Sequence, residues 1–379
     1  METSGSREPA EISLSDSGSA GLEGGSPGPG PGARPAAFQP EPVPGRPTMR
    51  DVAALAGVSL KTVSRVINGE PTVDQDLAAR VRRAAGQLSY RHNLTASNLR
   101  RGDGRSFMIG LMLEDVANPY SSSIYRAVED VARMRGVGVL AGSLDEDPER
   151  ERELAAALFA RRVDGLIVVP AGRDHTYLRR DQELGTALVF VDRPPELLQA
   201  DSVMADNRRG AAAGVAHLIR AGHRRIGFLS DLTSIRTAED RYAGYRDALR
   251  DAGLRHDPGL ERRDLHTADV AEAAAAGLLA GPQPPSALFS AQNLVTMGTV
   301  RALRARAAQH RVALVGFDDF SLADLLEPAV TVVAQDVTAI GSLAAEILFR
   351  RIDGDGSLPR AHIVPTRIVA RGSGEIALR

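Results

Sequence analysis

The sequence predicts a small all-α helix-turn-helix headpiece followed by an α/β core of two doubly wound parallel-sheet lobes. Three observations predict this architecture. Apolar residues recur at helical spacing through a short N-terminal stretch that a glycine interrupts. Beyond residue 106, runs rich in Val, Ile and Leu alternate with amphipathic stretches, and this alternation occurs twice. At 379 residues, the chain is long enough for two or three domains with sizeable cores.

The composition divides the chain into five segments. Residues 1–46 form a Gly/Pro/Ser-rich tail with too few large apolar residues for a core, which favours a passive disordered extension over a partner-binding segment. We expect the headpiece over 47–91, a hinge over 92–105, the two-lobed core over 106–371 and a C-terminal tail over 372–379.

The composition also limits the class of protein. The chain has no cysteine, which excludes disulfides and thiolate metal sites, and no two of its eight histidines stand at metal-ligand spacing. No apolar run reaches membrane-spanning length, and the N-terminus lacks the basic-then-apolar order of a signal peptide. We therefore expect a cytoplasmic protein with no metal, no cofactor and no membrane partner.

The stretch TMRDVAALAGVSLKTVSRVIN, residues 48–68, predicts two short helices joined by a tight turn. Thr48 is a suitable N-cap for the first helix, and Ser59 for a second that begins at Leu60. Gly57 can take the left-handed conformation that the turn needs. Two short helices around a glycine turn are typical of a helix-turn-helix.

The second of these helices has an apolar and a polar face. Val63 and Val66 fall on one side at helical spacing, whereas Lys61, Arg65 and Asn68 fall on the other. Headpiece and hinge together carry ten Arg or Lys against five Asp or Glu, although the whole chain has a net charge of −2. This pattern predicts that the second helix enters the major groove of double-stranded DNA.

A third helix, capped by Asp74, is expected to close the headpiece core. Its apolar residues at helical spacing are Leu77, Val81, Ala84, Ala85 and Leu88. Three basic residues of this helix could contact phosphate or stay solvated, and we expect at least one to be solvated; they are Arg80, Arg82 and Arg83.

The segment from Asn93 to Leu99 is too short for a helix that is stable alone, so it needs DNA or a second subunit as a partner. Leu99, followed by Arg100 and Arg101, suits an apolar wedge in the minor groove with basic anchors beside it. An ordinary interdomain linker fits the same pattern about equally well.

The core is predicted as two successive lobes. The first has strands over 107–113, 136–143, 165–170 and 187–192, and helices over 121–135 and 149–161. The second has strands over 225–230, 286–291 and 312–317, and helices over 209–221, 238–252 and 294–306. Their unalternating apolar runs are typical of parallel strands covered on both faces. Segments 331–335 and 362–370 and a helix near 337–351 should complete both sheets by crossing back between the lobes.

Ligands of open parallel sheets bind beyond the carboxyl ends of the strands. The polar candidates near those ends are Asp115, Tyr120, Asp192, Arg193, Gln292, Asn293, Asp318 and Gln335. If the lobes face each other, these side chains converge on a cleft suited to a polyhydroxylated or amide-bearing small molecule. For each residue singly, a helix cap, loop or rim role is the simpler interpretation, and their joint placement is the stronger evidence.

The sequence lacks signatures of catalysis. There is no nucleophile elbow, no P-loop and no glycine fingerprint after the first strand. Asp318 and Asp319 could form an acid/base pair, but successive residues at a strand end point in different directions. We therefore predict that the chain is not an enzyme.

Together, these features resemble the lac repressor (LacI/GalR) family of bacterial transcription regulators, from about Thr48 to Arg371. DVAALAGVSLKTVSRVIN is similar to the family's headpiece signature, and AGHRRIGFL, DRYAGYRDAL and VGFDD resemble its core motifs. The resemblance implies a periplasmic-binding-protein-like core in which Arg241 and Asp318 bind the effector. The predicted DNA-contacting set comprises Thr48, Leu60, Lys61, Thr62, Ser64, Arg65, Asn68, Asn93, Ala96 and the hinge leucine, Leu99.

Three features depart from the family pattern. His92 stands where a proline is common, which leaves the start of the hinge helix less constrained. Gln292–Asn293 replaces an amide-then-acid pair, which changes the hydrogen bonds offered to a ligand. The chain lacks the tetramer-forming tail of some members, so a homodimer is expected.

We therefore predict a homodimeric repressor that binds a pseudo-palindromic operator and is released by a small carbohydrate-type effector between the lobes. A solute-binding sensor protein is the alternative from another class, because the core alone would permit it. A corepressor-dependent regulator would use the same cleft, and the sequence does not distinguish it from an inducible one.

Overall fold

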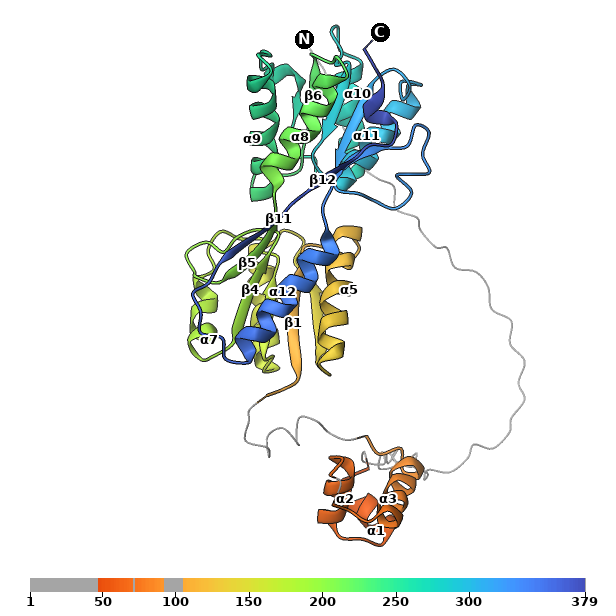
Figure 1. The fold of residues 1–379 in the computed structure, drawn as a ribbon, viewed down its shortest axis with the longest axis vertical. Helices are drawn as coiled ribbons and strands as arrows, with labels where there is room; N and C mark the ends of the chain where they lie inside the picture. Colours follow the sequence, from red (N-terminus) through yellow and green to blue (C-terminus); the bar gives the residue numbers. More distant parts are fainter. Residues whose placement is uncertain (1–46, 71, 92–104, 379) are drawn as a thin grey trace, which may run out of the picture. The chain divides into compact units, whose positions relative to one another are not determined.

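The computed structural model describes residues 47–70, 72–91 and 105–378 (Figure 1). The tail over 1–46 and the hinge residues Asn93, Ala96 and Leu99 lie outside this part, and what the sequence predicts for them stays a prediction. The chain divides between His92 and Asn93 into two compact units, the first all-α where it is described and the second α/β.

The first unit contains three helices in its described part: α1 (Met49–Ala56), α2 (Leu60–Ile67) and α3 (Gln75–Gln87). Thr48 and Asp51 form a capping box at α1, in which each side chain bonds the other's backbone N–H. Ser59 accepts a hydrogen bond from the Thr62 N–H at 3.1 Å, and Gly57 has a φ of 62°. The predicted caps and turn are therefore confirmed.

One small apolar cluster holds these helices together. Its buried members are Val52, Ala53, Ala56, Val63, Val66, Ala78, Val81 and Ala84. Arg80 of α3 donates from Nη2 to the carbonyl oxygen of Ala56 at 2.7 Å. This contact satisfies a carbonyl at the end of α1, so Arg80 joins α3 to α1. The sequence had suggested only phosphate contact or solvation for this side chain.

The second unit contains two six-stranded sheets, one in each lobe. The first sheet consists of β1 (Met108–Leu113), β2 (Gly138–Ser143), β3 (Gly165–Val168), β4 (Ala187–Val191), β5 (Asp201–Ala205) and β11 (Ala361–Val364), in the order β11-β5-β4-β3-β1-β2. The second consists of β6 (Ile226–Leu229), β7 (Glu261–Arg262), β8 (Ala287–Ser290), β9 (Ala313–Phe317), β10 (Thr331–Ala334) and β12 (Arg367–Val369), in the order β12-β10-β9-β8-β6-β7. All neighbouring strands are parallel except β10 and β12.

Helices cover both faces of each sheet, as the apolar runs of the strands predict. In the first lobe these are α5 (Pro119–Met134), α6 (Pro148–Ala160), α7 (Arg179–Glu183) and α12 (Val337–Ile352), with the 3₁₀ turn η1 (Thr176–Leu178). In the second they are α8 (Asn207–Arg220), α9 (Arg236–Asp251), α10 (Ala268–Leu279) and α11 (Asn293–Ala305), with η2 (Pro258–Leu260) and η3 (Ser373–Glu375). Predicted and observed helices agree to within two residues at each end wherever a predicted helix lies in the described part of the chain.

Strands β5 and β7 and helices α7 and α10 were not predicted. Strand β5 begins with Asp201 and Ser202, both buried, and Asp201 is held by hydrogen bonds from Arg351 and the Arg360 N–H. A strand that begins with two polar residues is therefore buried between β4 and β11, because the fold supplies the partners of those residues. Helix α10 is rich in alanine, so its apolar face has little contrast with the rest of its surface.

The chain passes between the lobes three times: from β5 to α8, from β10 to α12 and from β11 to β12 (Figure 1). The predicted crossing back of the C-terminal segments is therefore confirmed. Strand order reverses between β1 and β3 in the first sheet and between β6 and β8 in the second. Those are the positions where open α/β sheets form a ligand crevice. Within the described residues, no helix is both long and apolar enough to cross a membrane.

Candidate functional site

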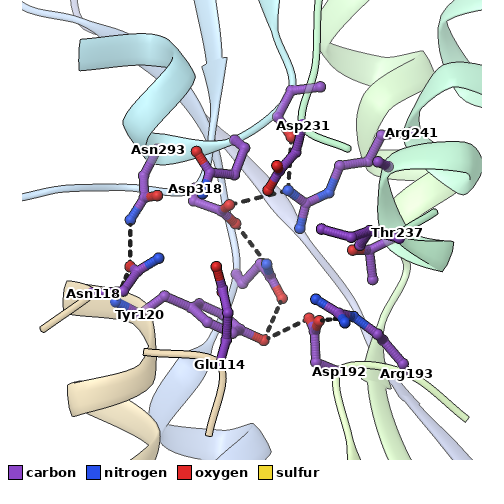
Figure 2. A pocket seen from close by; sticks show the side chains of 15 residues that line it. Glu114, Asn118, Tyr120, Asp192, Arg193, Asp231, Thr237, Arg241, Asn293 and Asp318 are labelled. Carbon is purple, nitrogen blue, oxygen red and sulfur yellow. Dashed lines mark hydrogen bonds and ion pairs between the residues drawn. The ribbon is translucent and has the colours of Figure 1, made fainter. Parts of the chain in front are cut away.

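A cavity of about 400 Å³, including its open mouth, lies at the carboxyl ends of both sheets (Figure 2). Its lining residues come from both lobes and from one crossing segment: Glu114, Asn118, Tyr120, Asp192, Arg193, Asp231, Ile235, Thr237, Ala238, Arg241, Ala291, Gln292, Asn293, Asp318 and Gln335. Most of its lining is polar.

Arg241, on the second turn of α9, is held in the cavity by three hydrogen bonds. Its Nη1 lies 3.1 Å from Asp318 Oδ2 and 2.7 Å from the Ala291 carbonyl oxygen, and its Nε donates to Asn207 Oδ1 at 2.8 Å. The guanidinium also lies 3.9 Å from the centre of the Phe317 ring. Nη2 donates no hydrogen bond within the described residues and remains available to a ligand.

Asp192 and Asp318 occupy matching positions in the two lobes, directly after β4 and β9. Both have left-handed backbone conformations, with φ of 68° and 70°, which are uncommon for residues other than glycine. Such backbone strain concentrates at functional sites. Burial raises the pKa of Asp318, although Arg241 and a hydrogen bond from Gln335 act in the opposite direction.

Gln335 links the carboxylates of the two lobes. It lies on the crossing segment between β10 and α12, and its Nε2 donates to Asp318 Oδ1 at 2.5 Å. The hydroxyl of Tyr120 lies 3.4 Å from Gln335 Oε1 and donates to Asp192 Oδ1 at 3.0 Å. Because Tyr120 bonds both groups, it is a polar member of the site rather than a purely apolar core residue.

One direct hydrogen bond joins the beginnings of helices from opposite lobes. Asn293, at the start of α11, donates from Nδ2 to Asn118 Oδ1, the N-cap of α5, at 2.8 Å (Figure 2). Both amides are more than nine-tenths buried. Gln292 caps α11 through its Oε1 and also lines the cavity, so the cap and the site roles coincide.

The Arg193 guanidinium is paired with groups of the protein rather than available to a ligand. Its terminal nitrogens donate to both carboxylate oxygens of Glu146, at 2.7 and 2.5 Å, and to the Pro170 carbonyl oxygen at 2.7 Å. This bidentate pair neutralises the Arg193 charge within the first lobe.

Glu114 and Asp231 bring two carboxylates from opposite lobes together in the cavity. Glu114 follows β1, Asp231 follows β6, and His266 lies beside them, with ligating atoms of all three within 4.8 Å of one another. Burial and the carboxylates of Glu146, Asp231 and Asp192 raise the pKa of Glu114 to about 8, although Arg193 lowers it. A hydrogen bond with Asp231 raises the pKa of His266 to about 9.

The structure brings eight of the nine predicted ligand residues to this cavity, counting Arg241 from the family resemblance. Asp115 is the exception and was wrongly placed: its Oδ1 accepts the Ala117 N–H at 2.8 Å and shapes the β1–α5 turn, so Glu114 occupies the cavity instead. The sequence prediction also missed three lining residues, Asn118, Asp231 and Thr237. It did not predict that His266 would lie beside two carboxylates. Asp231 stands directly after a predicted strand and could have been found by the rule that identified Asp192.

Asp318 and Asp319 point to different partners, as expected for successive residues. Asp318 pairs with Arg241, whereas Asp319 pairs with Arg371, its Oδ2 2.6 Å from Arg371 Nη2. The two carboxyls therefore do not form an acid/base pair.

Replacing Glu114 with glutamine should flatten the dependence of core stability on pH. Its pKa of about 8 in the folded chain exceeds the ordinary 4.5, so wild type should lose stability as pH rises through this interval. The melting temperature of Glu114→Gln minus that of wild type should therefore increase steadily from about pH 5 to pH 8. Each kcal/mol of difference in stability corresponds to roughly 2–4 °C. Parallel melting curves for the two proteins would contradict this, and Glu149→Gln, exposed on α6, is the matched control.

The second candidate site is the outer face of α2. Leu60 is 44% exposed, Lys61 and Arg65 are exposed, and Thr62 and Ser64 are partly exposed beside them. Arg65 lies 3.4 Å from Glu70 in a solvent-exposed ion pair, which contributes little to stability. Within its own unit, this helix therefore presents exposed polar and basic side chains that another molecule can contact.

A helix-turn-helix with such a face, on a chain whose core encloses a polar interlobe cavity, defines a DNA-binding regulator that responds to a small molecule. Comparisons with known proteins agree. Residues 48–93 match the family described as bacterial regulatory proteins, lacI family, and residues 215–374 match the periplasmic binding protein-like domain.

Two relatives and one solved structure extend this match over most of the chain. The regulator PtxS of Pseudomonas aeruginosa is 33% identical over 88% of this chain and 97% of its own length. The regulator CelR of Thermobifida fusca is 34% identical over 87% and 98%. A solved CelR–cellobiose complex is 31% identical over 86% and 100%, with a TM-score of 0.65. The chain belongs to the lacI family of bacterial regulatory proteins and is a DNA-binding transcription regulator.

Proposed function

We propose that the chain is a repressor that binds a pseudo-palindromic operator as a homodimer and releases it when a carbohydrate-type effector occupies the interlobe cavity. It acts in the cytoplasm, where the DNA is, and has no enzymatic activity. The solved structure of the relative CelR in complex with cellobiose supports a carbohydrate effector. The observation that carries the proposal is the cavity itself, in which carboxylates, amides and Arg241 converge from both lobes.

The contacts between the lobes suggest how ligand occupancy is transmitted. The Asn118–Asn293 hydrogen bond and the bridge from Tyr120 through Gln335 to Asp318 hold the lobes in one arrangement. A ligand that replaces these bonds changes the free-energy difference between the lobe arrangements and so shifts their populations. Operator and effector are then reciprocally coupled, typically by about 1–3 kcal/mol. The hinge over 92–105 is proposed to fold on the operator in only one of these arrangements.

Selection of operator sequences from random DNA with the full chain tests the proposal. We expect a pseudo-palindrome to be enriched, and a panel of sugars to release the selected operator in a gel shift. Enrichment followed by ligand-strengthened binding would identify a corepressor-dependent regulator. Ligand binding without any enriched sequence would favour a solute-binding sensor protein and contradict the proposal.

Lys61→Ala and Arg65→Ala are expected to weaken binding to the selected operator by about 1–3 kcal/mol each, because we propose that these side chains bond guanines in the major groove. Melting temperatures should remain near wild type, since both side chains are exposed. Gel-shift titration at fixed salt measures the loss, and Gln87→Ala, an exposed position of α3, is the control. Wild-type affinity in both variants would show that α2 does not read the operator.

A further inference from the structure

The cavity carries more negative than positive charge that is free to act on a ligand. Two of its four carboxylates, Asp192 and Asp318, already bond other groups of the site, while Glu114 and Asp231 face each other across the lobes. The two arginines do not offset this excess, because Arg193 is neutralised by Glu146 outside the lining and Arg241 by Asp318.

Glu114 and Asp231 both present oxygens without hydrogen-bond partners. The Glu114 carboxyl accepts no hydrogen bond within the described residues, and its side chain extends into the middle of the cavity (Figure 2). Asp231 is 6% exposed, and its Oδ1 accepts from the Leu232 N–H at 2.7 Å and pairs with His266 Nδ1 at 2.9 Å. Its Oδ2 accepts no hydrogen bond within the same residues. An unpaired buried carboxylate oxygen is costly, so a donor from a ligand is strongly favoured here.

Helix α9 contributes groups of another kind to the cavity. Two groups there have no hydrogen-bond partner among the described residues: Arg241 Nη2 and the hydroxyl of Thr237. Thr237 is 7% exposed. Both lie on the first two turns of α9, in the second lobe. These groups suit the hydroxyl oxygens of a sugar, whereas Asp231 Oδ2 can only accept a hydrogen bond.

We propose that the effector is a carbohydrate or polyol that carries a basic nitrogen, with its ammonium group between Glu114 and Asp231 and its hydroxyls on Arg241 and Thr237. This inference rests on the proposed function, since it specifies the ligand of the same cavity. An ammonium supplies three donors and a positive charge to the Glu114 carboxyl, which has no partner among the described residues and releases its proton when the cation binds. It also bonds Asp231 Oδ2, since Asp231 Oδ1 is already paired with His266. A neutral sugar leaves the excess charge uncompensated, and a sugar acid or phosphate adds to it. Because the two carboxylates belong to different lobes, the ammonium also joins the lobes.

His266 and the other charged groups around Glu114 and Asp231 favour an organic cation over a metal ion. His266 is paired with Asp231 and has a pKa of about 9, so it is protonated at neutral pH and does not ligate a metal in that form. Glu146 and Asp192 add negative charge nearby, and Arg193 adds a positive charge that Glu146 already neutralises.

Isothermal titration of the full chain with matched ligands tests the inference. The set is glucose, glucosamine and gluconate, together with cellobiose and its diamino counterpart, chitobiose with free amines. We expect each amine to bind at least about 10-fold more tightly than its hydroxyl parent, and the acid to bind more weakly than either. In Glu114→Gln the ratio of amine to parent affinity should fall to about one, while Glu149→Gln, exposed on α6, should keep the wild-type ratio.

Several outcomes would overturn the inference. They are a parent sugar or acid that binds as tightly as the amine, a panel in which no amine binds, and an unchanged ratio in Glu114→Gln. Stabilisation by Zn²⁺ or Mn²⁺ alone, reversed by EDTA, would assign Glu114, Asp231 and His266 to a metal instead. Release of the operator by neutral sugars would leave the proposed function intact, so the two failures are distinguishable.

Discussion

Replacing Arg241 with alanine is expected to abolish release of the operator by the effector and to destabilise the core by about 3–5 kcal/mol. Arg241 is 4% exposed, and its removal leaves Asp318, Asn207 Oδ1 and the Ala291 carbonyl oxygen without their donors in a buried site. Asp318 already has a raised pKa and should take up a proton more readily without Arg241, so the stability loss should grow as pH rises. Thermal unfolding at several pH values and gel shifts with effector measure the two effects.

A double variant separates stability from ligand response. Arg241→Met with Asp318→Asn removes both buried charges, so much of the lost stability should return, because replacing a whole buried pair is often neutral. The response to effector should not return, since both groups are proposed to bind it. Arg246→Ala, exposed on the same helix, should change stability by no more than about 0.5 kcal/mol. Effector response in the double variant would contradict the assignment of Arg241 and Asp318 to the site.

Replacing Gly298 with alanine is expected to destabilise the second lobe by about 3 kcal/mol, at the upper end of the usual overpacking range. Gly298 lies on α11 where it crosses α10, and a Cβ there would overlap the Ala268 carbonyl oxygen and lie 2.8 Å from Ala271 Cβ. Backbone atoms cannot rotate away as side chains do, so the two helices must separate. Thermal unfolding should show a lower melting temperature, by roughly 2–4 °C for each kcal/mol.

Gly277→Ala is a control that should have the opposite sign. Gly277 is an exposed residue of α10, with no heavy atom within 4 Å of its built Cβ and no left-handed φ. Alanine should therefore stabilise the helix by about 0.5–1 kcal/mol. Gly244, where α9 crosses α8, meets the Arg208 carbonyl oxygen in the same way and should behave like Gly298. If Gly277→Ala and Gly298→Ala shifted the melting temperature in the same direction, close helix packing would not explain the role of Gly298.

The headpiece was predictable in detail because its determinants are local. Thr48, Ser59 and Asp74 cap helices through bonds to residues two or three positions away, and Gly57 turns the chain within a single residue. The contact from Arg80 to Ala56 was not predictable in this way, since the two residues are 24 positions apart and meet only when α3 packs on α1.

The cavity was predictable in position but not in all its residues. Ends of parallel strands are visible in a sequence, and they correctly indicated Asp192, Arg193 and Asp318. Which of two successive carboxylates enters the cavity depends on the turn after the strand. In the β1–α5 turn, the hydrogen bond from the Ala117 N–H holds Asp115, and Glu114 is left facing the second lobe.

The sequence by itself determined the order and type of most elements, the helix caps and the family, because each is encoded in short-range pattern or motif. Only the tertiary structure decided that Asp201 begins a buried strand, that Asn118 meets Asn293 and that Glu114 faces Asp231. These contacts join residues far apart in the chain, and their cost or benefit depends on the burial and the partners that the folded lobes supply. The charge of the cavity, on which the proposed ligand class depends, is therefore a property of the fold.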